Sequence, residues 1–173
     1  MRISRRGVAQ SLGDDKIGGG DGADELWGGE GNDVLYGELG DDTLGGGNGN
    51  DEIGAGQGND VVYGGAGDDI LNGYAGNDTI GGGEGDDRIA GGTGSDMFVF
   101  SKGQDTITDF DAADALEQID LGWVSTITDF IDLSTGGHMS QVGSDVVIDD
   151  LLGNTLTLTS VSVNDLSGGD FLF

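Results

Sequence analysis

The chain has 173 residues, of which 33 are acidic and six are basic, so that its formal net charge is -27; glycine contributes 38 residues, and proline and cysteine are absent. The lack of cysteine excludes disulfides and thiolate metal sites. The negative charge argues against binding to nucleic acid or to an anionic membrane, since both need basic patches. No apolar run is long enough to span a bilayer, so we expect no membrane insertion.

The first segment, MRISRRGVAQSL (1–12), is predicted to be an N-terminal tail. It contains arginines but no apolar core, and therefore does not match a signal peptide of the usual kind. If the protein is exported, we expect its targeting signal to lie elsewhere in the chain.

From residue 13 the sequence repeats every nine residues. Full phrases begin at 19, 28, 37, 46, 55, 64, 73, 82 and 91, as in GGEGNDVLY (28–36). In all of them place four is glycine, place six is aspartate and place eight is apolar. The phase extends back to 13–17 and forward to 103–107, and it weakens at Asp114, where the preceding glycine is replaced by alanine. Such a fixed short period indicates a repeat architecture.

Each phrase is unsuited to an amphipathic helix, because every glycine would cost about 1 kcal/mol relative to alanine. It is better interpreted as a turn, GGxGxD, followed by a three-residue strand whose middle side chain points inward. Two phrases then close one coil, and stacked coils form an all-β, right-handed parallel β-roll (a β-solenoid) over residues 13–108. The departures at Ala55 (place one) and at Glu38 and Tyr74 (place two) are expected to weaken single turns.

Stacking brings aspartates 18 residues apart into neighbouring positions, in two rows. At about 4.8 Å, the strand spacing, two such charges repel by about 1 kcal/mol in water and by about 3–4 kcal/mol at an effective dielectric constant of 20. We therefore predict that the roll does not fold without a counter-ion. The odd row consists of Asp15, Asp33, Asp51, Asp69, Asp87 and Asp105, and the even row of Asp24, Asp42, Asp60, Asp78 and Asp96.

These aspartates indicate calcium. Calcium takes six to eight oxygen ligands in flexible geometry, whereas magnesium demands a stricter octahedron. Zinc prefers nitrogen or sulfur, and the single histidine, His138, lies outside the repeats. The sequence thus predicts several Ca²⁺ ions, about eight or nine in the roll, one for each neighbouring pair of aspartates.

The phrases GGAGDDILN (64–72) and GGEGDDRIA (82–90) resemble the RTX repeat of bacterial proteins exported by type I secretion, among them proteases and lipases. The resemblance implies a calcium-filled parallel β-roll in which backbone carbonyls from the first four places of each turn complete the ligand set. The implied carbonyl ligands are Gly20, Gly22, Gly29, Gly31, Gly40, Gly47, Gly49, Gly56, Gly58, Gly65, Gly67, Gly76, Gly83 and Gly85.

Residues 109–173 are predicted to form a β-rich cap over the C-terminal end of the roll, since an open coil presents unpaired strand edges. Short alternating strands are expected at 105–111, 118–121, 144–150 and 154–161. The last two are expected to form a hairpin that turns near Gly153 and Asn154.

Two parts of this region also resemble the family. The segment GQDTITDFDAADALEQIDL (103–121) resembles the part that closes the β-roll in secreted RTX proteases and lipases, which implies a further ion held by Asp105, Asp109, Asp111 and Asp114. The alternative is that these are solvated turn aspartates. The ending DFLF (170–173) resembles an uncleaved type I export signal; the alternative is a last β-strand. Export would make the protein extracellular, with the type I apparatus as a partner.

We predict a non-catalytic module that is unfolded at low calcium and folds on extracellular calcium. HExxH, GxSxG and cysteine nucleophiles are absent from the sequence, and His138 is expected to be a loop residue. The alternative is a polysaccharide- or surface-binding module of an extracellular enzyme or adhesin, with Trp27, Tyr36 and Tyr63 stacking on sugars rather than packing along the roll. Because rolls of this kind follow a catalytic or adhesive domain, such a domain upstream is a further expected partner.

Overall fold

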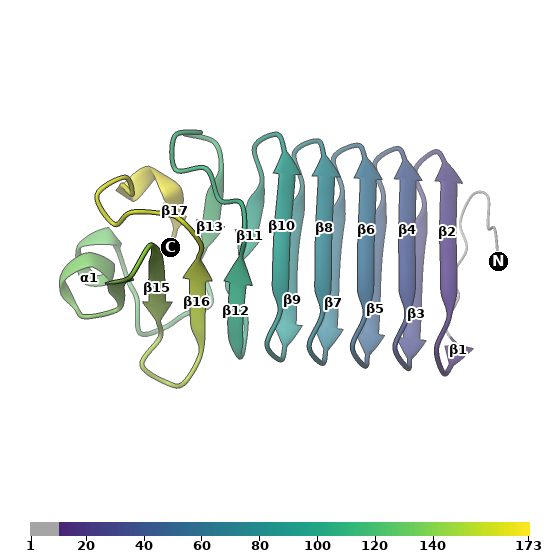
Figure 1. Ribbon diagram of the computed structural model, residues 1–173, viewed down its shortest axis with the longest axis horizontal. Coiled ribbons are helices and arrows are strands. Elements are labelled where there is room, and N and C mark those ends of the chain that lie inside the picture. The colour runs from purple at the N-terminus through teal and green to yellow at the C-terminus, as the bar shows by residue number, and fades with distance from the viewer. Residues whose placement is uncertain (1–10) are drawn as a thin grey trace.

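The structure is a computed structural model that describes residues 11–173. Most of the predicted N-terminal tail, residues 1–10, therefore lies outside the described part. Two sheets wind around one axis, and over residues 11–120 the strands alternate between them, so that strands two places apart along the chain pair in parallel (Figure 1). This is the predicted parallel β-roll with two phrases per coil. In the register, Lys16 pairs with Val34 and Ile17 with Leu35, a shift of 18 residues.

The first sheet has eight strands and the second nine. The first contains β1 (Ser11–Leu12), β3 (Glu25–Glu30), β5 (Thr43–Asn48), β7 (Val61–Ala66), β9 (Thr79–Glu84), β11 (Met97–Val99), β13 (Gln118–Asp120) and β17 (Phe171–Leu172). The second contains β2 (Lys16–Asp21), β4 (Val34–Leu39), β6 (Glu52–Gln57), β8 (Ile70–Ala75), β10 (Arg88–Thr93), β12 (Gln104–Ile107), β16 (Thr155–Leu158), β15 (Asp145–Asp149) and β14 (Met139–Val142). Strand β1 lies within the segment expected to be a tail.

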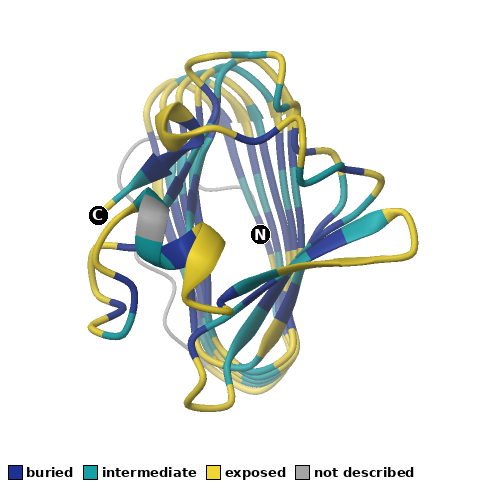
Figure 2. Ribbon diagram, turned by 90° about the vertical axis from the view of Figure 1, so that its left-hand side faces the viewer, coloured by how far each residue is buried: buried dark blue, intermediate teal, exposed yellow. Residues whose placement is uncertain are grey.

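The core is a stack of the place-eight side chains, as predicted. All of these side chains are buried. Viewed along the axis, buried residues recur along the strands of both sheets, whereas the turns at the two edges of the roll are largely exposed (Figure 2). Aliphatic and aromatic burial of this kind supplies the main apolar contribution to folding. The stack consists of Ile17, Leu26, Leu35, Leu44, Ile53, Val62, Leu71, Ile80, Ile89, Phe98 and Ile107.

The strands are longer than predicted: in the full phrases from β2 to β10 they have six residues instead of three. Each continues from places seven to nine into places one to three of the next phrase, and only the place-one residue, such as Gly19 in β2, is skipped in the pairing. Pairing resumes at place two because glycine there adopts a positive φ, 106° at Gly20, which turns the backbone back toward the neighbouring coil. The turn itself is reduced to GxD.

Two coils adopt this left-handed conformation without glycine, at Glu38 (φ 79°) and Tyr74 (φ 72°). A side chain in this region costs about 1–2 kcal/mol. We therefore expect Glu38→Gly to raise the free energy of unfolding by about 1 kcal/mol, which raises Tm by about 2–4 °C in a chain of this size. Thermal unfolding in saturating calcium measures the effect. Glu38→Ala retains the Cβ atom and is expected to give no such gain; an equal gain in both variants would contradict the explanation.

The aromatic residues at place nine pack along the roll. A Cβ atom at Gly45 would lie 2.3 Å from Trp27 Cζ3, and one at Gly54 would lie 3.2 Å from Tyr36 Cδ1. These rings therefore cover the glycines of the next coil. Tyr63 remains 47% exposed. Lateral packing, one of the two interpretations left open by the sequence, accounts for Trp27 and Tyr36.

The C-terminal region forms a β-rich cap over the last coil (Figure 1). The predicted hairpin is confirmed: β15 and β16 pair antiparallel, with Asp149 opposite Thr155, and Gly153 has φ 111° in the turn. β16 continues the second sheet beyond β12, and β17 continues the first beyond β13. The interpretation of the chain end as a last strand is thus confirmed, with Phe171 3% exposed.

Some features of the cap were not predicted. Helix α1 (Phe130–Thr135) is capped at its N-terminus by Asp129, whose side chain accepts a hydrogen bond from the Asp132 backbone N–H. A short 3₁₀ helix spans Gly168–Asp170. Strand β14 was missed as well. Among residues 11–173, no helix is long and apolar enough to cross a membrane.

Candidate metal centres along the roll

The place-six aspartates form the two predicted rows, one at each edge of the roll where the chain turns from one sheet into the other. In every pair, Oδ1 of one aspartate accepts a hydrogen bond from the backbone N–H of the aspartate 18 residues earlier, at 2.7–3.1 Å. All nine predicted neighbour pairs are therefore in place. From Asp24 to Asp105 the aspartates are at most 5% exposed, whereas Asp15 is partly exposed at the N-terminal end.

The second carboxylate oxygen is the unusual feature of these rows. Oδ2 is buried without any hydrogen-bond partner in eight consecutive members: Asp24, Asp33, Asp42, Asp51, Asp60, Asp69, Asp78 and Asp87. Buried polar atoms are normally paired, and an unpaired buried charge is strongly unfavourable. The basic residues in the described part, Lys16, Arg88 and Lys102, are exposed on the outside. Among residues 11–173, therefore, no basic side chain supplies positive charge to the rows.

Glycine at place one creates the space around these oxygens. A Cβ atom at Gly28 would lie 2.2 Å from Oδ2 of Asp33 and 2.5 Å from the carbonyl oxygen of Gly46 in the next coil. Gly46 repeats the arrangement with Asp51 and Gly64. A carboxylate oxygen and a carbonyl oxygen thus converge where a side chain would otherwise be.

The glycines implied as carbonyl ligands share one backbone conformation. All fourteen have φ between 106° and 140°. At place four the coils approach so closely that a Cβ atom at Gly58 would lie 2.1 Å from the carbonyl oxygen of Gly40. Glycine is therefore required at this place, because the place-four carbonyl of one coil lies against the place-four Cα atom of the next.

The residues at place five form a second set of contacts, on the exposed side of the turns. The side-chain oxygen of Asn32 accepts from the backbone N–H of Asn50, and that of Asn59 from Asn77. These bonds run from a later coil to an earlier one, the reverse of the bonds at place six. Each turn is thereby clamped to its neighbours on both sides by amide or carboxylate oxygens.

Burial raises the pKa of the place-six carboxyls. The pKa is raised to about 7 at Asp69 and Asp105 and to about 6 at Asp42 and Asp78, chiefly because burial disfavours the charged form. Neighbouring aspartates in the row contribute in the same direction. The pKa values of Asp51, Asp60, Asp87 and Asp96 are raised as well.

The raised pKa values predict that protonation of the place-six carboxyls partly replaces a cation in stabilising the roll. A carboxyl whose pKa is higher in the folded chain binds protons preferentially in that state, so stability increases as the pH falls from about 7 toward the unfolded value of 3.8. In metal-free buffer we expect strand content by circular dichroism to be higher at pH 5 than at pH 8. In saturating calcium the trend is reversed, because protons compete with the metal. The same pH response with and without calcium would contradict the prediction.

The donor set fits calcium. All candidate ligands are oxygens, from carboxylates and from backbone carbonyls in glycine-rich turns, which suits the flexible coordination of this ion. Within residues 11–173, no group of three or more His, Cys, Asp or Glu side chains gathers at one point. An ion in the rows would therefore be held by two carboxylates, with carbonyl oxygens completing its ligands.

Sequence reasoning missed one member of the even row. Gln118 pairs with Met97 in the register, and its N–H donates to the carbonyl of Asp96 at 2.9 Å, so Glu117 occupies the position that follows Asp96 in the row. Glu117 is 5% exposed, and burial raises its pKa to about 7. Asp114, the residue in phase, lies instead in the preceding loop and accepts from Ser95 Oγ at 2.8 Å. Three additional residues in the coil shift the phase, and only the apolar residue at 119 marks the new register.

The four aspartates that the resemblance implied as one further site each have separate partners. Asp109 accepts from the N–H groups of Gly91 and Gly92, Asp111 from Ala113, and Asp105 from the hydroxyl of Ser101 at 2.6 Å. In the described residues they do not come together as a group. Asp111 and Asp114 accept from the residue two places on, as turn aspartates do, whereas Asp105 and Asp109 accept from backbone N–H groups of the neighbouring coil.

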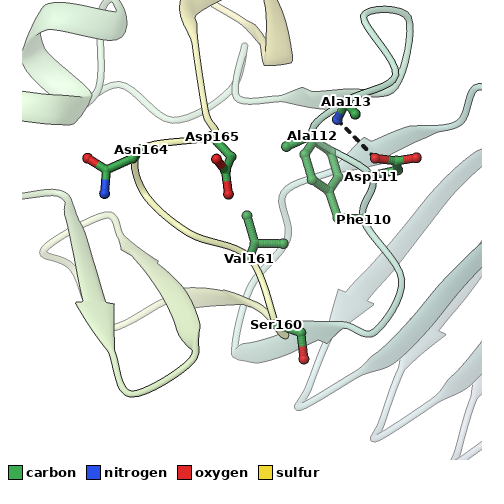
Figure 3. Close-up of a pocket in the computed structure, with 8 residues that line it drawn as sticks. All are labelled: Phe110, Asp111, Ala112, Ala113, Ser160, Val161, Asn164 and Asp165. Carbon is green, nitrogen blue, oxygen red and sulfur yellow. Dashed lines mark hydrogen bonds between the residues drawn. The ribbon is translucent and has the colours of Figure 1, made fainter.

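Other polar features lie away from the rows. His138 is 5% exposed and its Nδ1 lies 2.8 Å from the carbonyl oxygen of Asp149, a packing contact within the cap. An open depression of about 530 Å³ lies between the loop after β12 and the loop after β16 (Figure 3). Phe110 and Val161 provide its apolar surface, and Asp111 and Asp165 its carboxylates.

The sequence profile of the RTX calcium-binding nonapeptide repeat matches four times, at residues 11–44, 18–53, 45–80 and 75–107. Together these matches cover more than half of the chain. The chain belongs to the RTX calcium-binding repeat family. Its nonapeptides are therefore calcium-binding RTX repeats, and the two sheets that they build are an RTX β-roll.

Two solved structures are similar in arrangement to this RTX protein. The extracellular lipase LipA from Serratia marcescens is 20% identical, with 96% of this chain and 40% of the lipase covered at a TM-score of 0.49. The AlgE6R3 subunit of the Azotobacter vinelandii mannuronan C5-epimerase is 22% identical, with 95% and 81% covered at a TM-score of 0.41. The RTX chain thus spans 40% of the length of the lipase. A sequence search of curated proteins gave no match.

Proposed function

We propose that this chain is a non-catalytic calcium-binding module of a secreted bacterial protein, unfolded at low calcium and folded cooperatively where calcium is abundant. The observation that carries the proposal is the row of buried Oδ2 atoms without partners. Paired carboxylates of neighbouring coils would hold each ion, namely Asp15 to Asp105 in the odd row and Asp24 to Asp96 in the even row, with Glu117 at its end. Calcium would supply the positive charge that these positions lack.

The coupling to folding follows from the shared ligands. Each interior aspartate belongs to two neighbouring pairs, so that filling one site orders a ligand of the next. Ions that bind only the folded chain stabilise it by mass action. Sites of extracellular modules have dissociation constants on the order of 10⁻⁴–10⁻³ M, and they would be empty at cytosolic calcium concentrations. The chain would then remain unfolded until it leaves the cell.

The proposal divides the chain into the roll, 13–108, which binds the ions, and the region 109–173, which caps it. A chain exported unfolded is compatible with the type I apparatus, with the last residues 170–173 as part of the signal. The lipase named above is longer than this chain, which supports a catalytic or adhesive domain upstream in the whole protein. These roles in secretion and stabilisation are part of the proposal.

Isothermal titration calorimetry tests the proposal directly. We expect about eight or nine calcium ions to bind, with heat effects that include folding, and magnesium at the same concentration to produce little binding because it dehydrates reluctantly and requires a strict octahedron. Substitution of calcium by magnesium is the control for simple charge screening. Equal stoichiometry and folding with both cations would contradict the assignment to calcium.

A further inference from the structure

One residue distinguishes a single turn from all the others in the roll. Place one is glycine in eight of the nine full phrases and alanine only at Ala55. At those eight glycines, an added Cβ atom would lie 1.9–2.8 Å from Oδ2 of the place-six aspartate of the same phrase. Real Cβ atoms do not approach other atoms so closely. In the turn 55–60, this methyl group is present.

Alanine at place one differs from glycine in the space that its methyl group occupies and not in backbone strain. Place-one residues, Ala55 included, do not have positive φ, so the backbone accepts alanine without strain. Ala55 is fully buried, at 0% exposure. The Oδ1 atom of Asp60 keeps its regular bond with the Asp42 N–H at 2.7 Å, and the Asp60 N–H donates to Asp78 at 2.8 Å. The ladder is thus intact, and by the pattern of the glycine turns the methyl group lies on the side of Asp60 Oδ2.

The methyl group affects one particular space between coils. In six of the eight other turns, the space that a Cβ atom would take is bounded by Oδ2 of the same phrase and by the place-one carbonyl of the coil 18 residues later, as at Gly46 with Asp51 and Gly64. For Ala55 the corresponding groups are Asp60 and the carbonyl of Gly73. The affected site is therefore the one between turns 55–60 and 73–78.

We propose that Ala55 makes this the weakest calcium site of the roll, which fills last and interrupts the even row between Asp60 and Asp78. The inference rests on the proposed function. A methyl group that occupies space between two oxygen ligands moves them apart and replaces part of an all-oxygen environment by an apolar one, and calcium requires six to eight oxygens at about 2.3–2.6 Å. At intermediate calcium the roll would hold a full complement of ions except at this site.

Three variants test the inference. Ala55→Gly removes the methyl group, Gly46→Ala introduces one in the odd row, where Cβ would lie 2.1 Å from Asp51 Oδ2, and Ala55→Gly/Gly46→Ala does both. In calorimetric calcium titrations, we expect one ion in the native chain to bind roughly ten-fold more weakly than the rest, a loss typical of disturbed ligand support. We expect no such ion in Ala55→Gly and two in Gly46→Ala.

The double variant is the matched control. Its composition is identical to that of the native chain, so the effect of glycine on the unfolded chain cancels. It should again show one weak ion, but at a different place. Backbone amide NMR locates that place: the late-shifting signals in a titration should be those of Asp60 and Asp78 in the native chain, and those of Asp51 and Asp69 in the double variant.

The outcomes separate the inference from the proposed function. If Ala55→Gly binds calcium with an unchanged isotherm and the Asp60 and Asp78 amides do not respond late, the inference is wrong while the proposed function stands. If the native chain binds no calcium, the proposed function fails and the inference with it. Should Gly46→Ala not fold, the comparison of Ala55→Gly with the native chain still decides.

Discussion

Removal of calcium with a chelator is expected to unfold the roll completely. Without the cation, nine pairs of neighbouring carboxylates face each other in two rows, and eight of their oxygens are buried without partners. Each pair opposes folding by about 1–4 kcal/mol, depending on the effective dielectric constant. Together the nine pairs oppose folding by about 9–36 kcal/mol, which is as large as or larger than the net stability of about 5–15 kcal/mol that a folded domain usually has.

Circular dichroism and small-angle scattering measure this effect together. The strand signal should disappear, and the radius of gyration should rise from a value near that of a compact chain of this length, about 16 Å, toward about 44 Å for an unfolded one. Added sodium chloride is the control, because it screens exposed charges but reaches buried pairs much less. A sample in excess chelator that remains strand-rich and compact would refute the calcium dependence.

The second large effect is expected for Asp69→Asn. Asp69 belongs to two pairs, with Asp51 and with Asp87. Asparagine can keep the oxygen that accepts from the Asp51 N–H, but it loses the charge and places an NH₂ group at the position of Oδ2. Two calcium sites are thereby weakened. If each contributes about 2.7 kcal/mol at a hundred-fold excess over its dissociation constant, the loss in calcium is about 5 kcal/mol.

In metal-free buffer the same substitution should act in the opposite direction. It removes one buried charge, that of a carboxyl whose pKa is raised to about 7, so folding of the metal-free chain should become less unfavourable. Asp15→Asn is the matched control: Asp15 lies partly exposed at the end of the row and has only Asp33 as its described neighbour in the row, so its loss in calcium should be about half or less. Chemical denaturation in saturating calcium, and strand content by circular dichroism as metal-free buffer is acidified, measure the four values. Equal losses at Asp69 and Asp15 would argue against shared sites.

The sequence was sufficient to predict the roll because every interaction in it repeats at a fixed spacing. The inward position of Leu35 and the contact of Asp33 with Asp51 both follow from the nine-residue phase alone. Strand length was predicted incorrectly, because glycine at place two was interpreted as part of the turn. A positive φ at Gly20 returns the backbone to the sheet, and a pattern of residue types does not distinguish that from a turn.

The cap was predicted only in part, for a related reason. Alternation of apolar and polar residues was enough to predict the β15–β16 hairpin. The position of Glu117 depends on three additional residues between β11 and β13, which shift the nine-residue phase. No particular residue type in this segment marks that shift. Asp114 keeps the nominal spacing but lacks the preceding glycine, so the predicted even row ended at Asp96. Helix α1 has only six residues and depends on packing in the cap rather than on a periodic pattern of its own.

The hydrogen bonds between turns show that the two carboxylate oxygens of a place-six aspartate have separate roles. Oδ1 specifies how one coil is joined to the next, and an amide oxygen performs that task equally well, as Asn32 and Asn59 do at place five. Only Oδ2 creates the demand for metal. A sequence with asparagine throughout place six would retain the hydrogen bonds between coils. Its side-chain NH₂ groups would then be directed toward neighbouring carbonyls. Geometry and metal dependence are therefore separable in this architecture, and a solenoid of the same shape that needs no ions is an accessible design.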